Sequence, residues 1–143
     1  MKISAKTDYA CRALLELALH WPKTEPLAIN VIAASQKVPI KFLTHILITL
    51  KQLDYVTSSR GNKGGYVLIK PPSEISLGEI VKHFNEIGQT KPNRTRNRDK
   101  KEDALNVIWR EADQVLFGYL DNISFDDLLK RAEQVKTVLM YTI

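Results

Sequence analysis

The chain has 143 residues, of which 44% are hydrophobic and 26% charged, and these proportions are typical of a globular protein rather than a disordered or fibrous one. It has no run of about 20 apolar residues and no signal-peptide pattern after Met1, so we expect a cytoplasmic protein with no membrane partner. The single cysteine, Cys11, excludes an internal disulfide and cannot alone supply the thiolates of a zinc or iron-sulfur site.

The net charge of +5 is concentrated in the first half of the chain. Residues 1–70 carry ten Lys and Arg against four Asp and Glu, a net charge of +6, whereas residues 71–143 carry eleven against twelve, a net charge of −1. The first half is therefore the candidate for binding a polyanion. Many soluble proteins carry a similar excess of cations for solubility alone. The motifs must therefore decide whether this charge binds a polyanion or only keeps the protein soluble.

The first predicted helix, from about Thr7 to Trp21, is apolar over most of its circumference. A narrow polar stripe recurs every four positions along it and consists of Asp8, Arg12, Glu16 and His20. Cys11, Leu15 and Leu19 widen the apolar surface beyond that of an ordinary surface helix. We expect this helix to be covered on two sides, by its own domain and by a partner.

A helix-turn-helix is predicted next. A short apolar helix at about Ala28 to Ser35 is followed by a turn, Gln36 to Val38, and Pro39 then starts a helix that ends at about Leu53. In this second helix the apolar positions at helical spacing, expected to be buried, are Phe42, Leu43, Ile46, Leu47, Leu50 and Leu53. The positions expected to face outward are Lys41, Thr44, His45, Ile48 and Gln52. Any small helical bundle gives the same periodicity, so this signal alone is weak.

A basic β-hairpin is predicted directly after the second helix. Tyr55 to Ser59 and Tyr66 to Lys70 read as strands, joined by a glycine-rich turn that carries Arg60, Asn62 and Lys63. The prolines that follow end the second strand, since proline cannot donate to the ladder. Ser76 and Glu79 then form a capping box for a helix that runs to about Asn85.

The last third of the chain predicts a basic loop and two helices. Gly88 to Asp103 is polar and strongly basic, and we expect it to be mobile. Beyond it, apolar residues at spacings of three and four describe an amphipathic helix of about five turns from Leu105 to Ile123. Ser124 can cap a last helix from Phe125 to about Val135. The long amphipathic helix requires a partner surface.

The helix and the hairpin together indicate a DNA-binding surface, with Lys41, Thr44, His45, Arg60, Asn62 and Lys63 as its candidate contact residues. Arg60 at the tip of the hairpin, next to glycines that allow close backbone approach, suits insertion into a narrow minor groove. Lys41, Thr44 and His45 occupy the first turns of the recognition helix, which usually meet base edges or phosphates in the major groove. The alternatives are an exposed hairpin with solubilising charges and an ordinary solvated helix face.

Several stretches also carry a family resemblance, namely Ile3–Ala10 with Arg12–Leu14, Phe42–Leu43, Arg60–Tyr66, and Pro71–Pro72 with Ile75–Ile80. Through them, the chain from Met1 to about Glu86 resembles the iron-sulfur-cluster-regulator (IscR-type) family of bacterial winged-helix repressors. The resemblance implies a homodimer in which a long C-terminal helix packs against its mate and the partner's first helix. The residues expected at this interface are Leu105, Ile108, Trp109, Ala112, Val115, Leu116 and Tyr119.

The chain departs from that family at the cluster ligands. Cluster-binding members use three cysteines in the loop before the dimerisation helix, and the loop from Gly88 to Asp103 has none. Asp8 matches an acidic ligand position of one branch, but one carboxylate without thiolates cannot hold a cluster. Cys11 lies outside the ligand positions, and the three histidines show no metal-binding spacing. We therefore expect no metal site and no cofactor.

These patterns predict a mainly α fold with a small β-hairpin, in three parts: a winged helix-turn-helix domain at residues 1–87, a basic flexible loop at 88–103, and dimerisation and C-terminal helices at 104–143. The expected function is a transcriptional repressor that binds a palindromic operator in double-stranded DNA as a homodimer. The alternatives are a winged-helix protein-interaction module and a regulator gated by a small-molecule or protein effector. No motif for enzymatic chemistry is visible. The sequence identifies neither the operator, the regulated genes, the direction of regulation, nor a redox role for Cys11.

Overall fold

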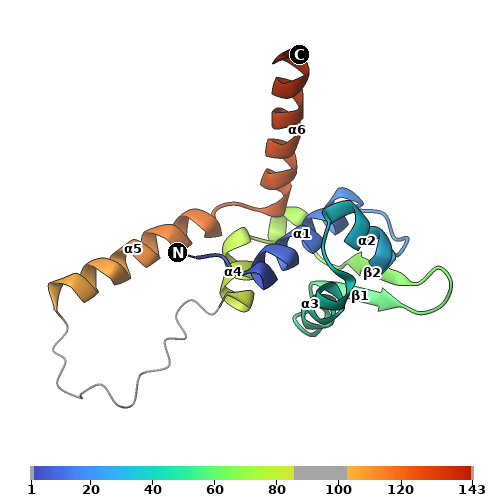
Figure 1. Ribbon diagram of the computed structural model, residues 1–143, viewed down its shortest axis with the longest axis horizontal. Coiled ribbons are helices and arrows are strands. Elements are labelled where there is room, and N and C mark those ends of the chain that lie inside the picture. Colours follow the sequence, from blue (N-terminus) through green and yellow to red (C-terminus); the bar gives the residue numbers. More distant parts are fainter. Residues whose placement is uncertain (1, 86–102, 143) are drawn as a thin grey trace.

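The computed structural model describes residues 2–85 and 103–142 (Figure 1). These residues form a mainly α fold with one antiparallel two-stranded sheet, as predicted. Its elements, in chain order, are α1 (Ala5–Leu19), α2 (Ile29–Gln36), α3 (Ile40–Gln52), β1 (Val56–Ser59), β2 (Gly65–Leu68), the 3-10 helix η1 (Pro72–Glu74), α4 (Leu77–Phe84), α5 (Ala104–Asp121) and α6 (Phe125–Thr142). The predicted basic loop lies outside the described residues, except for Asp103, whose side chain caps α5.

Helix α1 is the centre of the core and packs against α2, α3, α4 and α6. It begins after Ser4, whose hydroxyl accepts a hydrogen bond from the backbone N–H of Thr7 at 3.1 Å, so the helix starts two residues earlier than expected. The core that it forms with these elements is apolar. The core residues with no exposed surface are Ala10, Ala13, Leu14, Ile32, Leu43, Leu47, Leu50, Ile75, Ile80 and Phe125.

The polar stripe of α1 is only partly on the surface. Asp8 and Arg12 form an exposed ion pair at 2.8 Å. Glu16, in contrast, is 6% exposed, and its Oε2 accepts hydrogen bonds from Ser35 Oγ at 2.9 Å and Gln36 Nε2 at 2.7 Å. This buried carboxylate therefore joins α1 to the end of α2.

Helices α2 and α3 form the predicted helix-turn-helix. They are bent by 116° relative to each other, within the usual range for this motif. The bend is made possible by Lys37, which adopts the left-handed conformation at φ 55°, and by a bond from Val38 N to Ala33 O at 3.0 Å. The prediction that Phe42 is buried is wrong: its side chain is 48% exposed, because it lies at the edge of the buried face, where the Tyr9 ring covers only part of it.

Strands β1 and β2 form the predicted hairpin, in a register that pairs Val56 with Leu68 and Ser59 with Gly65. The loop before α2 adds a second, very short pairing to β2, because Leu27 bridges to Tyr66. The hairpin is thereby attached along both edges of β2. Its position relative to α2 is consequently defined by backbone hydrogen bonds.

The C-terminal helices project from this body. Backbone bonds from Leu77 N to Ile123 O at 2.7 Å and from Phe125 N to Ile75 O at 3.0 Å hold the junction between α5 and α6 against α4 and η1. From there α5 and α6 extend in different directions, and α5 lies at the opposite end of the long axis from the hairpin (Figure 1). Helix α6 continues to Thr142, well beyond the predicted end near Val135.

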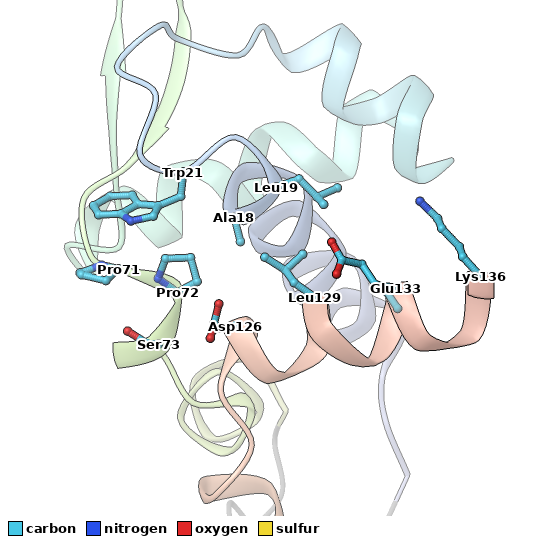
Figure 2. A pocket seen from close by; sticks show the side chains of 11 residues that line it. Ala18, Leu19, Trp21, Pro71, Pro72, Ser73, Asp126, Leu129, Glu133 and Lys136 are labelled. Atoms are coloured by element: carbon cyan, nitrogen blue, oxygen red, sulfur yellow. The ribbon is translucent and has the colours of Figure 1, made fainter. Parts of the chain in front are cut away.

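A pocket of about 400 Å³ lies between the end of α1, η1 and α6 (Figure 2). Trp21, Leu19, Pro72 and Leu129 supply its apolar lining. Among the described residues no single helix is long and apolar enough to cross a membrane, and only the bent pair of α2 and α3 passes that test of length and composition.

Candidate nucleic-acid interface

The outer face of α3 carries the residues that the sequence assigned to the major groove. Lys41 and His45 are exposed, and Thr44 is half-buried. Lys41 Nζ lies 5.0 Å from the centroid of the Phe42 ring, so the ammonium group and the exposed aromatic ring form a cation–π interaction. The Thr44 hydroxyl donates to Ile40 O at 2.9 Å, in the preceding turn of the helix.

The turn between β1 and β2 is fully on the surface at its tip. Arg60, Asn62 and Lys63 are all exposed, as a residue that contacts DNA must be. Gly61 has φ +107°, a conformation that L-residues rarely adopt, and its carbonyl accepts from Gly64 N at 2.9 Å. The tip is therefore a tight, defined turn from which the cationic side chains extend.

The two glycines after the tip are required by contacts within the chain. A Cβ on Gly64 would lie 2.6 Å from Ser59 O, and a Cβ on Gly65 would overlap the Leu27 carbonyl. Sequence analysis ascribed these glycines to close approach of the backbone to DNA. The structure instead gives each of them an intramolecular reason.

Two further cations flank the interface and were not among the predicted residues. Lys51 Nζ donates to Ser58 Oγ at 2.7 Å and so links the last turn of α3 to β1. Lys37 is exposed in the turn between α2 and α3. Both belong to the basic first half of the chain, and their position at the two ends of α3 is the signal that would have identified them.

The apolar face of α5 is exposed in the single chain. All seven residues predicted for the dimer interface have exposed side chains, including Val115 at 72% and Trp109 at 60%, and none of the residues of α5 is buried. Helix α6 carries a separate exposed apolar surface that includes Val138 and Leu139, which are 63% and 58% exposed. This second surface was not predicted, because α6 was expected to end near Val135 and instead continues to Thr142.

The donor atoms needed by an iron-sulfur cluster are missing from this chain. Cys11 is its only cysteine, and burial in α1, with the nearby Asp8 carboxylate, raises the pKa of the thiol from 9.0 to about 12. Asp8 itself is paired with Arg12. No group of three or more His, Cys, Asp or Glu residues in the described part of the chain is arranged to hold a metal ion. These residues do not fit a cluster whose ligands are thiolates.

Comparison with known proteins gives a consistent result. The Rrf2 family, described as an iron-dependent transcriptional regulator, matches residues 3–131. A protein of Synechocystis sp. named as an HTH-type transcriptional regulator is 35% identical, over 90% of this chain and 87% of its own length. The HTH-type transcriptional regulator IscR of Klebsiella pneumoniae is 29% identical, over 93% of this chain and 82% of its own.

Solved structures agree with the sequence relatives. The IscR of T. potens superposes with a TM-score of 0.77 at 26% identity, covering 94% of this chain and 90% of that one. CymR, the global cysteine regulator of B. subtilis, superposes with a TM-score of 0.75 at 27% identity, covering 92% of this chain and 98% of that one. These relatives are regulators rather than enzymes. The chain belongs to the Rrf2 family of transcriptional regulators, and it has their DNA-binding winged helix-turn-helix fold.

Proposed function

We propose that the protein is a homodimeric repressor that binds an inverted-repeat operator, with α3 in the major groove and the hairpin in the adjacent minor groove. The observation that carries the proposal is the basic surface formed by the outer face of α3 and the tip of the hairpin. Lys41 and Arg60, one from each element, are exposed on it. Cations on two neighbouring elements suit two neighbouring grooves of one duplex. Repression would follow from occupancy of a promoter, and this activity places the protein in the cytoplasm.

The homodimer is supported by the apolar surface of α5. A run of exposed residues such as Ile108, Trp109 and Val115 on one helix is costly in water and is typical of an interface. A second copy of the same helix is the simplest surface of complementary shape and length. The two-fold symmetry of such a dimer would present two recognition helices to two half-sites.

We infer that the dimer binds DNA without an iron-sulfur cluster. The inference depends on the missing thiolates described above. Anaerobic reconstitution with iron and sulfide should leave the protein without visible absorption, while its affinity for DNA stays the same. Stoichiometric cluster uptake with a visible spectrum would overturn this part of the proposal.

Footprinting on a selected genomic site tests the proposal as a whole. Two protected segments should appear, with centres separated by about one helical turn, roughly 34 Å, or a multiple of it. The affinity should fall steeply with salt, because phosphate contacts release counterions. Affinity that does not respond to salt would favour the alternative of a protein-interaction module, and full-affinity binding to one asymmetric half-site would contradict the dimer.

A second candidate function, gating by a small-molecule effector, is favoured by the pocket between α1, η1 and α6 (Figure 2). It combines the Trp21 ring and Pro72 with the carboxylates of Asp126 and Glu133 and the ammonium group of Lys136. Asp126 also pairs with Lys130 at 3.0 Å, which leaves Glu133 as the main acceptor for a cationic group. An apolar ligand with a cationic group would be complementary to this lining. Aliphatic diamines and aromatic amines are suitable probes, and binding should raise the melting temperature of the wild type but not of Trp21→Ala.

A further inference from the structure

The outer face of α3 has an apolar centre. Ile48 is 45% exposed and lies one helical turn from Thr44 and one turn from Gln52. The ionisable residues His45 and Lys51 stand three positions before and after it. Nearly half of this isoleucine is uncovered in the free protein, so that part of its apolar surface is available for a ligand.

Thr44 adds a second apolar group to this centre. Its hydroxyl proton is used within the helix, since Oγ1 donates to Ile40 O at 2.9 Å. What Thr44 can offer to a base edge is therefore its methyl group and an acceptor oxygen. Beside Ile48 and Thr44, the main side-chain donor in the middle of the recognition helix is His45, whereas cations stand at both of its ends.

The apolar pocket beside α3 does not account for Ile48. That pocket is lined by Ala5, Lys6, Tyr9, Phe42, His45 and Ile46, and Ile48 is not among them. Phe42 and Ile48 lie on different sides of the helix, because six residues correspond to a rotation of about 240° from one side chain to the other. Ile48 stands instead among polar neighbours, as an isolated apolar group on a basic surface.

We propose that Ile48, together with the methyl group of Thr44, reads the 5-methyl group of thymine in the major groove. The inference rests on the proposed function, in which α3 enters that groove. Thymine is the base that presents a methyl group there, and apolar side chains recognise it by contact. Lys41 and Lys51, at the two ends of the helix, would meet phosphates and hold Ile48 at the depth of the base edges.

The test replaces thymine by deoxyuridine, which removes the methyl group and keeps the hydrogen-bonding pattern. Duplexes that bind the wild type are first selected from a randomised library, and each thymine of the selected half-site is then replaced in turn. At one or two positions the wild type should bind about fourfold more weakly, the equivalent of about 0.8 kcal/mol for one buried methyl group. Ile48→Ala should lose most of this discrimination, and the remainder should come from the methyl group of Thr44.

Ile69→Ala is the matched control. Ile69 is 48% exposed, as much as Ile48, but follows β2 rather than lying on α3. This variant should discriminate between thymine and deoxyuridine as the wild type does. Both side chains are about half exposed, so the two variants should show small and similar decreases in melting temperature.

The outcomes separate the inference from the function on which it rests. If the wild type binds its selected duplexes and no deoxyuridine position weakens binding, the methyl readout is wrong and the regulator function stands. If Ile48→Ala discriminates between thymine and deoxyuridine as strongly as the wild type, the assignment of this contact to Ile48 is wrong. If no duplex is selected in a salt-dependent manner, the proposed function itself fails, and the inference fails with it.

Discussion

Leu27 and Tyr66 exchange two backbone hydrogen bonds, each with an N···O distance of 2.9 Å. They pair the loop before α2 with the second strand of the hairpin. Gly65, next to Tyr66, lies directly against the Leu27 carbonyl. The distance between the wing and the helix-turn-helix is thus fixed at one point where no side chain fits.

We expect Gly65→Ala to lower the free energy of unfolding by about 1–3 kcal/mol, because the added Cβ must push β2 away from Leu27. Affinity for DNA should fall as well, since α3 and the wing would no longer reach their grooves together. Gly118→Ala is the control: that position lies in α5 with open space around it, so alanine should stabilise the helix by up to about 1 kcal/mol. Urea denaturation measures both, and an unchanged midpoint for Gly65→Ala would contradict the argument.

Glu16→Ala should lower the free energy of unfolding by about 1–3 kcal/mol, because it removes both hydrogen bonds that join α1 to Ser35 and Gln36. These two residues immediately precede the turn of the helix-turn-helix, so DNA affinity should fall in parallel. Glu111→Ala, at an exposed position of α5, should change stability by less than about 0.5 kcal/mol. Equal effects of the two substitutions in thermal melts would mean that the buried carboxylate of Glu16 contributes no more to stability than an exposed one.

Glu16 also illustrates what the sequence could and could not predict. Helical periodicity, the capping box at Ser76 and Glu79, and the glycine-rich turn identified the order and type of the helices and strands, because these signals are local. The burial of Glu16 depends on where the end of α2 packs, which no local pattern contains. The exposure of Phe42 was also beyond a local pattern. Helical periodicity places Phe42 at the edge of the buried face, and how much of its ring is covered depends on its neighbour Tyr9 in α1.

The site was predicted unevenly. The positions of Lys41 and Arg60 on the surface followed from spacing and from turn chemistry, and their contacts with DNA remain a prediction. Lys51 was missed, because its approach to Ser58 requires α3 to pack beside β1. The exposed apolar end of α6 was missed because the sequence was read as ending that helix near Val135.

Cys11 should be unreactive and should make the protein sensitive to alkali. Its thiol pKa is raised from 9.0 to about 12 in the folded protein, chiefly by burial. The unfolded chain therefore loses this proton above about pH 9, while the folded chain keeps it until about pH 12, so stability is lost as the pH rises through this window. In denaturation series from pH 8 to pH 11, Cys11→Ala should lose less stability than the wild type.

Alkylation gives an independent check on the same thiol. At pH 8 iodoacetamide should modify native Cys11 at least about tenfold more slowly than the urea-unfolded chain, because the thiolate is the reactive species. Rapid modification of the native protein, followed by mass spectrometry, would indicate an activated thiol. That result would reopen a redox role for Cys11.

If α5 forms the proposed dimer interface, Ile108→Asp combined with Leu116→Asp should give a monomer where the wild type gives a dimer. Both side chains are exposed in the single chain, at 53% and 38%, and carboxylates cannot be buried in an apolar interface without a large cost. Gln114→Asp adds a charge on nearly the opposite side of α5 and should leave the dimer intact. Sedimentation equilibrium decides, and a dimeric mass for the double variant would show that this face is not the interface.

Arg60→Ala and Lys41→Ala should weaken DNA binding in different ways, and this contrast tests the assignment of wing and helix to different grooves. If Arg60 enters a narrow minor groove, its removal should cost about 1–3 kcal/mol on operators with A/T-rich flanks and less on G/C-rich flanks. If Lys41 meets a phosphate, its removal should weaken all sequences by similar factors and lower the salt slope by about one ion. Thr44→Ala should instead relax the preference at a single major-groove base pair.

Titrations of flank-varied duplexes at several salt concentrations separate these effects. Lys136→Ala is the control for the loss of one positive charge, because Lys136 is exposed on α6, which projects away from α3 and the hairpin (Figure 1). It should leave both flank preference and salt slope unchanged. Arg60→Ala could instead keep the flank preference of the wild type and lower only the salt slope, by about one ion. Arg60 would then contact a DNA phosphate from outside the minor groove. The recognition helix would then carry the sequence specificity alone, since the wing would supply affinity without reading the width of the minor groove.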